Sequence, residues 1–287
     1  MAYRRKRLVE TTIQDLTPLT LATTQPRAQG AARLLVKARD GKTVISRLHQ
    51  QGSLKLLFPR TDDTALTAVT LNTAGGITGG DRFDLRLSAE PNTRLTVTTQ
   101  AAERAYRASF GQGRVCTGLN VTENARICWL PQETILYDGA ALARRLDVTL
   151  GAQATCLLVE SLIFGRVAMG ETVRDLDLDD RITLRRAGRI IFADRARLQG
   201  DANAHLSQLA TGGGAGAMAS LIFAAPGASD HLDAARALLP ATAGMSQPAP
   251  DVLFARILAP DGFTLRQALI PLIAQFRTDP LPRPWMI

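Results

Sequence analysis

The Gly-rich stretch at residues 71–81 is the most unusual local pattern that could carry chemistry. It reads LNTAGGITGGD, with the two glycine pairs Gly75-Gly76 and Gly79-Gly80. It lacks the Gly-Lys-Ser/Thr ending of a nucleotide-binding P-loop, and it precedes a strand pattern instead of the helix that a dinucleotide-binding motif requires. Because glycine allows positive φ and close backbone approach, the stretch predicts a tight loop. Three hypotheses for it are a structural turn, a segment that contacts a partner or lines a passage, and a phosphate cradle.

Side chains that bind metals tightly are few and scattered. The three histidines are His49, His205 and His231, without a His-x-x-x-His spacing. The three cysteines lie in or beside strand patterns, where a small buried side chain is the usual role; they are Cys116, Cys128 and Cys156. A tight, permanent metal site is therefore not predicted.

Carboxylates are the remaining candidates for metal contact, through weak oxygen ligation. The candidates are Asp81, Asp138, Glu160 and Glu171. Each of them, taken alone, is equally well explained as a solvated or ion-paired side chain.

Motifs of nucleophilic or acid–base catalysis are missing from the sequence. No Gly-x-Ser-x-Gly occurs, and Ser53 has no identifiable partner. A glycosidase needs two carboxylates facing one groove. The carboxylates at i, i+2 spacing are Asp175, Asp177 and Asp179, which fit a solvated acidic edge better. No enzymatic role is predicted, and a carbohydrate-active β-solenoid enzyme is kept as an alternative.

The chain is strongly basic, with a formal net charge of +8 over 287 residues. Thirty of the 34 cationic side chains are arginines, which form planar forks for carboxylates and phosphates. The one dense run is RRKR at residues 4–7, which fits a free basic tail. A nucleic-acid-binding protein is a further alternative, but no aromatic platform or DNA-binding motif accompanies the run, so nucleic acid is not the expected partner.

Neither a membrane protein nor a secreted protein is expected. The longest apolar runs, such as 157–159, are far shorter than the roughly 18–20 residues that span a bilayer. The basic start is followed by VETT at 9–12 instead of an apolar signal region. Three scattered cysteines do not make a disulfide framework, so a cytoplasmic protein is expected.

The elements that must position these residues are mainly β-strands. Alternating apolar residues predict strands at 67–71, 82–87, 94–98, 146–150 and 182–184. Four strand–turn–strand units recur, and their turns close at Arg94, Arg126, Thr155 and Arg189, in steps of 32, 29 and 34 residues. This repeat predicts stacked coils that share one core, a β-solenoid-like body, with ordinary hairpins in a sandwich as the alternative.

The C-terminal third has a different pattern. It predicts strands at 221–223 and 252–258, a helix at 230–239, an amphipathic helix at 262–277 and an extended Pro-rich end at 280–287. Pro271 should kink or split the second helix. We therefore expect a loosely ordered basic lead-in (1–30), a repeating β body (31–200) and a smaller α+β part (201–287) packed on the body, together forming one continuous domain.

Seven segments, in order, resemble the UreD (UreH) family of urease accessory proteins. Besides the Gly-rich loop they are GSLKLLFP (52–59), TTQAAERAYRA (98–108), WLPQETILYDGA (129–140), ESLIFGRVAMGE (160–171), GRIIFADRARL (188–198) and LPRPWMI (281–287). The resemblance runs from about residue 40 to the end. The chain departs from the family's motif at Thr73-Ala74, where Pro-Pro is usual.

The resemblance implies a mainly β protein of stacked sheets that works as a non-enzymatic chaperone. Family members associate with UreF and the GTPase UreG and help to deliver nickel to apo-urease. The family's nickel route is a passage through the β body, and by motif position its carboxylates here are Asp81, Glu160 and Glu171. No cofactor would be bound tightly, because Ni²⁺ would be in transit. Replacing Asp81 by Ala is expected to lower nickel loading with the fold intact. The segment 262–287 would either face UreF or pack on the chain's own body.

Overall fold

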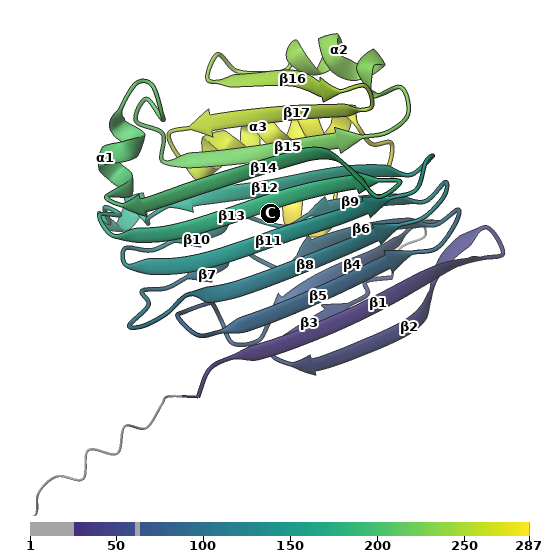
Figure 1. Cartoon of the computed structure of the whole chain (residues 1–287), viewed down its shortest axis with the longest axis horizontal. Coiled ribbons are helices and arrows are strands. Elements are labelled where there is room, and N and C mark those ends of the chain that lie inside the picture. The colour runs from purple at the N-terminus through teal and green to yellow at the C-terminus, as the bar shows by residue number, and fades with distance from the viewer. Residues whose placement is uncertain (1–25, 61–63, 287) are drawn as a thin grey trace, which may run out of the picture.

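Two β-sheets packed face to face form the body of the computed structural model, which describes residues 26–60 and 64–286 (Figure 1). The first, sheet A, contains seven strands. They are β1 (Gln29–Arg39), β2 (Lys42–Gly52), β5 (Arg82–Ala89), β8 (Gly113–Val121), β11 (Ala140–Leu150), β13 (Leu176–Arg186) and β14 (Arg189–Gly200). Their order across the sheet is β14-β13-β11-β8-β5-β1-β2.

Sheet B contains ten strands. They are β3 (Leu54–Leu57), β4 (Leu66–Asn72), β6 (Arg94–Thr99), β7 (Glu103–Ala105), β9 (Arg126–Leu130), β10 (Thr134–Leu136), β12 (Thr155–Phe164), β15 (Ala217–Ala224), β16 (Ala243–Ala249) and β17 (Val252–Ala259). Eight strands follow the order β16-β17-β15-β12-β9-β6-β4-β3, while β10 pairs with β12 and β7 pairs with β10. The helices are α1 (Ala202–Ser207), α2 (Leu232–Arg236) and α3 (Gly262–Gln275), with short 3₁₀ turns η1 (Val167–Met169), η2 (Ala228–His231) and η3 (Arg283–Trp285). The prediction of a mainly β protein is confirmed.

The chain alternates between the sheets from β4 to β13, so that successive coils stack in a solenoid. Neighbouring strands of the stack are parallel. Arg94, Arg126 and Thr155, which close the first three predicted turns, are in-register neighbours on β6, β9 and β12. The predicted stacked coils are therefore confirmed, and the alternative of ordinary hairpins in a sandwich is wrong for this part of the chain.

The corners between the coils are four-residue turns with matching hydrogen bonds. The amide of Thr93 donates to the carbonyl of Glu90, and equivalent bonds close the turns at 122–125 and 151–154. In the first two corners an asparagine, Asn92 or Asn124, takes a positive φ of 61° or 56°. Asparagine tolerates this left-handed conformation better than most residues, so the sequence of these polar turns favours the backbone conformation of the corner.

The fourth predicted repeat, which would close at Arg189, is wrong. Strand β14 does not cross to sheet B but pairs antiparallel with β13. The turn between them has two residues, Ala187 and Gly188, with φ of 49° and 77°. Two consecutive residues at positive φ make a tight hairpin turn, which reverses the chain within one sheet.

Antiparallel pairs close each end of the stack. In sheet A these are β1 with β2 and β13 with β14. In sheet B they are β3 with β4 at one end and, at the other, β12 with β15, β15 with β17 and β17 with β16. The outermost strands are consequently β2 and β14 in sheet A and β3 and β16 in sheet B. The predicted lead-in falls mostly on residues 1–25, which lie outside the described residues.

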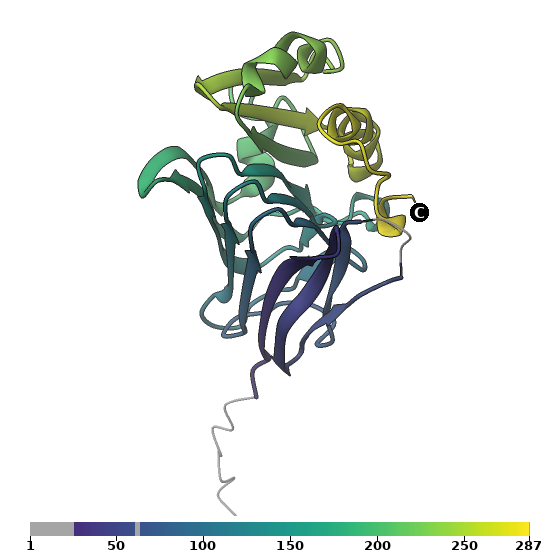
Figure 2. The ribbon, with the colours of Figure 1, turned by 90° about the vertical axis from the view of Figure 1, so that its right-hand side faces the viewer.

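Helix α3 packs its apolar stripe on the outer face of sheet B, where Figure 2 shows it end-on beside the sheets. The buried residues of the stripe are Leu265, Leu269, Leu272 and Ile273. The predicted split at Pro271 is wrong, because one helix runs through it. Pro271 and Gln267, whose carbonyl loses its helical partner, are both exposed, so water can satisfy that carbonyl. No helix among the described residues is long and apolar enough to cross a membrane.

Two other C-terminal predictions need correction. The helix expected at 230–239 is shorter and divided into η2 and α2. The end expected to be extended forms the turn η3, because the indole of Trp285 is buried and donates to the carbonyl of Leu130 at 2.8 Å. The guanidinium of Arg266 on α3 also donates to the carbonyl of Pro284, at 2.7 Å. These contacts fasten the chain end to α3 and to sheet B.

Candidate functional site

An ionic cluster lies between the two sheets. Arg144 on β11 forms ion pairs with Asp180 on β13, at 2.6 Å, and with Glu160 on β12, at 2.9 Å. Only 11% of the Arg144 and Glu160 side chains is exposed. The guanidinium also donates to the hydroxyl of Thr134, at 2.9 Å, and the indole of Trp129 donates to Glu160 Oε1, at 2.7 Å. Each partner therefore has hydrogen bonds that offset its burial.

The two-residue period of the strands places this cluster in the interior. On β11, Arg144 belongs to the inward series that also holds Leu142 and Leu146. Asp180 occupies the equivalent inward position on β13, and the parallel register sets it directly beside Arg144. Glu160 enters from the opposite sheet, in line with the buried Leu158 on β12.

The cluster has one cation for two carboxylates, so it carries excess negative charge if both are ionised. Burial raises the pKa of Glu160, and the nearby positive charge of Arg144 opposes that rise only in part. Burial lowers the pKa of Arg144, but the charges of Asp180 and Glu160 more than offset this, so the net shift is upward. Arg144 therefore stays charged, and Glu160 takes up a proton more readily than an exposed glutamate.

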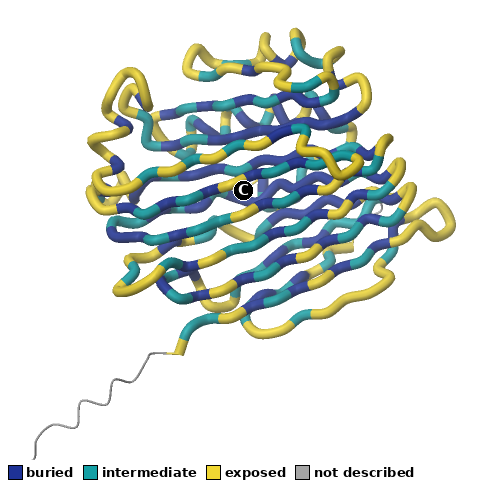
Figure 3. The backbone as a smooth tube through the Cα atoms, in the orientation of Figure 1, coloured by how far each residue is buried: buried dark blue, intermediate teal, exposed yellow. Residues whose placement is uncertain are grey.

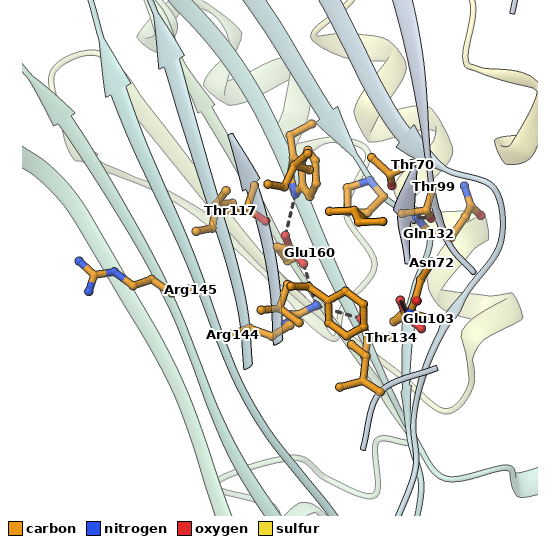
Figure 4. Close-up of a pocket in the computed structure, with 18 of the residues that line it drawn as sticks. Thr70, Asn72, Thr99, Glu103, Thr117, Gln132, Thr134, Arg144, Arg145 and Glu160 are labelled. Carbon is orange, nitrogen blue, oxygen red and sulfur yellow. Dashed lines mark hydrogen bonds and ion pairs between the residues drawn. The ribbon is translucent and has the colours of Figure 1, made fainter. Parts of the chain in front are cut away.

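A cavity of about 100 Å³ adjoins the cluster, and Figure 4 shows the side chains around it. Arg144 and Glu160 point toward each other, whereas Arg145 points away. Glu103 on β7 adds a further carboxylate to the lining. It accepts hydrogen bonds from Asn72 Nδ2, at 3.2 Å, and from the amide of Arg104, at 3.0 Å. Burial raises the pKa of Glu103, and no cation is paired with it among the described residues.

Such a cavity can hold a few water molecules. Most of its lining is apolar. The polar part combines carboxylates, hydroxyls and amides, whose oxygens suit hydrated divalent cations, with the guanidinium of Arg144. Within the described ranges, no three His, Cys, Asp or Glu side chains are close enough together to hold a metal ion.

Asp81, the first predicted passage residue, closes the Gly-rich loop. Its Oδ1 accepts the amide of Ala28 and its Oδ2 accepts the amide of Thr78, both at 2.8 Å. The side chain is buried, with 4% of the residue exposed. Asp81 thus ties the end of the loop to the segment that enters β1.

The Gly-rich loop itself packs against residues 104–112. Ile77 exchanges backbone hydrogen bonds with Arg104 and Tyr106, at 2.7 and 2.8 Å. A Cβ atom on Gly79 would lie 1.9 Å from the carbonyl oxygen of Phe110, so only glycine fits there. Gly75, Gly76 and Gly80 have positive φ. The loop also reaches the cavity, because Asn72 Nδ2 donates both to the carbonyl of Gly76, at 3.0 Å, and to Glu103.

Glu171, the third predicted passage residue, lies in the loop before β13. It accepts hydrogen bonds from Arg166 Nε, at 2.8 Å, and from the amides of Arg166 and Asp138. The hydrogen bond from Arg166 is the main cause of the lowered pKa of Glu171. Asp138 in turn accepts the amides of Arg174 and Asp175. These carboxylates fasten the loops at one end of the coils to one another.

The predicted carboxylates therefore belong to three separate hydrogen-bond networks, at the Gly-rich loop, in the interior and in the loop before β13. Sequence reasoning missed Glu103, Arg144 and Asp180. The sequence pattern could have revealed two of them, because Arg144 and Asp180 occupy inward-facing positions in the alternation of β11 and β13. Cys128 and Cys156 are buried as predicted, whereas Cys116 is half-exposed on sheet A.

The acidic residues expected to form a solvated edge are more constrained than predicted. Asp179 pairs with Arg181 at 2.6 Å and with Arg195 at 2.7 Å, and hydrogen bonds from these arginines lower its pKa. Asp177 accepts hydrogen bonds from Gln112 and Gln199. Both carboxylates lie on the outer face of sheet A, where neighbouring arginine or glutamine side chains bind them.

Replacing Asp81 by Ala should lower the free energy of unfolding by about 1–3 kcal/mol, because two partly buried amides lose the buried carboxylate that accepts from them. Urea denaturation of the purified chain measures this loss. The matched control is Asp84→Ala, three residues away, where a partly exposed pair with Arg86 is lost and the expected change is at most about 1 kcal/mol. Equal losses in the two variants would contradict the role given to Asp81.

Replacing Glu171 by Gln should remove a pH-dependent part of the stability. Because the folded pKa is lowered, the carboxylate stabilises the fold above about pH 4.3, the ordinary glutamate value, and loses this effect as the pH falls through the folded pKa. Wild type should therefore be more stable than the variant at pH 7, and the two should converge in acid. A difference that is constant from pH 7 to pH 3 would rule this out.

The chain is similar to known proteins over almost all of the described residues. A family model described as UreD urease accessory protein matches residues 28–286. The chain is 48% identical over 264 residues to the Urease accessory protein UreD of Roseobacter denitrificans, covering 92% of this chain and 96% of that protein. It is 49% identical over 246 residues to the protein of that name from Ruegeria pomeroyi, covering 85% and 96%. The corresponding protein of Rhizobium rhizogenes is 45% identical over 266 residues, covering 92% and 97%.

Proposed function

The chain belongs to the UreD family of urease accessory proteins, and from this we propose that it serves urease maturation by passing Ni²⁺ to the apo-enzyme. In this proposal the chain is a scaffold and not a catalyst. Nickel is its cargo, and no cofactor stays bound. UreF, the GTPase UreG and the apo-urease subunits are its partners, and all of them act in the cytoplasm.

The single observation that best supports the nickel proposal is the interior cavity with its carboxylates. Glu103 and Glu160 line it together with Asp180, and all three offer oxygen ligands. Ni²⁺ binds nitrogen and sulfur ligands much more tightly, so contact with a few carboxylate oxygens would favour release over retention. Asp81 and Glu171 remain candidate passage residues by their place in the family motifs, although in this structure their oxygens hold backbone amides.

The pKa shifts in the cavity suit a transit site. Glu103 and Glu160 have raised pKa values because they are buried. Metal and proton compete for such a carboxyl, because a bound cation favours its ionised form. Arg144 compensates part of the negative charge when no metal is present, which keeps the interior from becoming a tight cation trap.

The accessory role is tested by reconstituting urease with and without this chain. Deletion from a strain that makes urease, UreF and UreG should yield urease with little nickel, as measured by elemental analysis of the purified enzyme. A tagged copy should restore nickel and should retain UreF, UreG and apo-urease in a pull-down. Normal nickel content in the deletion strain would overturn the proposal.

The alternative of a carbohydrate-active enzyme has less support. The acidic residues at i, i+2 spacing that favoured it, Asp177 and Asp179, are bound to arginine and glutamine side chains. They do not present a free acid and base across one groove, which retaining and inverting mechanisms both need.

A further inference from the structure

The outer face of sheet A carries much of the chain's positive charge. Its five central parallel strands present alternate residues to solvent, and Figure 3 shows this alternation of buried and less buried positions. Parallel sheets usually have both faces covered by other elements. No helix of the described chain packs on this face, since α3 covers the outer face of sheet B.

Several of the arginines on this face are paired with aspartates of the same face. Asp84 binds Arg86 and Asp179 binds Arg181, at 2.8 and 2.6 Å. Asp147 binds Arg145. These pairs join residues of one strand or of neighbouring strands. The negative charge of each aspartate is thus offset by arginine.

Other arginines on this face have no carboxylate within 4 Å among the described residues, and four of them lie on β1, β5, β8 and β14. They are Arg33, Arg82, Arg114 and Arg197. Arg82 and Arg114 are direct neighbours across β5 and β8. Like charges placed opposite each other destabilise a sheet, so this pair costs the fold stability.

A shallow groove of about 410 Å³ runs along these two arginines. Its lining includes Gln29, Gln51, Arg82, Asp84, Arg114 and Cys116. The side chains of Arg82 and Arg114 are exposed and donate no hydrogen bond to the described chain. Their guanidinium forks are thus free for two-pronged contact with carboxylates.

We infer that this face, centred on Arg82 and Arg114, docks onto a carboxylate-rich surface of apo-urease. The inference rests on the proposed function, which makes urease the protein that the chain must contact. Bound carboxylates would relieve the repulsion between the two arginines and would add charge-assisted hydrogen bonds. Excess positive charge around the groove would steer the acidic surface toward it.

An acidic protein fits this face better than a nucleic acid does. The aspartates interspersed among the arginines would repel a continuous phosphate backbone. The strands form a broad sheet face with no helix or ribbon on it that could enter a DNA groove. Short, separated carboxylates on a protein surface can instead match the free arginines and avoid the aspartates.

The test is the affinity of the purified chain for apo-urease, measured by biolayer interferometry from 50 to 500 mM NaCl. The double variant Arg82→Gln/Arg114→Gln should bind about tenfold more weakly at low salt, mainly through a slower on-rate, and should approach wild type at high salt. The matched control is Arg60→Gln/Arg283→Gln, which removes two exposed arginines that lie beside each other near β3 of sheet B, outside this face, and should leave the affinity within about twofold.

The outcomes separate the inference from the function on which it rests. If wild type does not bind apo-urease at all, the proposed function fails first. If wild type binds but the double variant binds equally well, only the docking face is wrong. If the double variant keeps its urease affinity but loses salt-sensitive binding to a 20-bp DNA duplex, the face serves nucleic acid and the inference is overturned. Thermal melts of all variants are the check that each one is folded before its affinity is compared.

Discussion

Replacing Arg144 by Met should lower the free energy of unfolding by about 3–5 kcal/mol. Methionine fills about the same space as the aliphatic part of the arginine side chain. It leaves Glu160 and Asp180 as two buried carboxyl groups without a cation. Thr134 also loses a hydrogen-bond partner. Chemical denaturation at pH 7 measures the loss, and we expect the largest effect of any single substitution proposed for this chain.

The next residue on the same strand supplies the control. Arg145 points outward, is more than half exposed and pairs with Asp147. Arg145→Met should therefore cost no more than about 1 kcal/mol. Adding Glu160→Gln to Arg144→Met should recover part of the loss, because one of the two uncompensated carboxyl groups is removed. If Arg144→Met and Arg145→Met lower the free energy of unfolding by similar amounts, the ion pairs of Arg144 do not stabilise the interior cluster as proposed.

The pH dependence of Arg144→Met gives an independent check. Without the arginine, the pKa of Glu160 rises further in the folded state, because the positive charge that opposed the effect of burial is gone. A raised carboxyl pKa gives stability that is complete below the unfolded value, near pH 4, and that is lost as the pH rises through the folded value. The deficit of the variant should therefore be smallest in acid and should grow toward neutral pH.

Replacing Glu103 by Gln should reduce the nickel content of urease without weakening the fold. The raised pKa means that ionised Glu103 costs stability at neutral pH, so a neutral glutamine should leave the free energy of unfolding unchanged or increase it. The loss of a carboxylate should lower metal affinity in the cavity by about tenfold or more. Urease purified from cells that carry the variant should then contain less nickel, as measured by elemental analysis.

A carboxylate at the far end of the same coil serves as the control for Glu103. Glu90 lies on the corner before β6, whereas Glu103 follows that strand. Glu90→Gln should leave nickel loading unchanged. Glu160→Gln should reduce it as Glu103→Gln does, although it also removes an ion pair to Arg144. Full nickel content in both cavity variants would remove the interior from the nickel route.

Much of the fold follows from local pattern, and the exceptions have local causes. The corners at 90–93, 122–125 and 151–154 have similar lengths and polar residues, so their repetition predicts stacked coils. The Ala187-Gly188 turn is shorter, and because of this the chain forms a hairpin there instead of a further coil. The pairing of β15 with β12 joins residues about sixty positions apart, which no local pattern reveals.

The candidate site was only partly predictable for similar reasons. Glu160 was found through a family motif, and it does lie in the interior. The predicted strands at 146–150 and 182–184 begin too late to include Arg144 and Asp180; extending the alternation backward would have placed both in the core. Glu103 sits on a strand of three residues, too short for any periodic pattern. Its proximity to the cavity depends on tertiary packing alone.

The outermost strands have a consequence for the chain in a crowded solution. An open strand edge is a template for addition of another molecule, and a stack of coils could in principle grow into a fibre. Each of the four edges is unsuited to this. Strands β2 and β14 carry cationic side chains, β3 has four residues, and β16 contains Pro248 and an irregular register. The protein can therefore keep a sheet-rich body and still resist amyloid-like polymerisation.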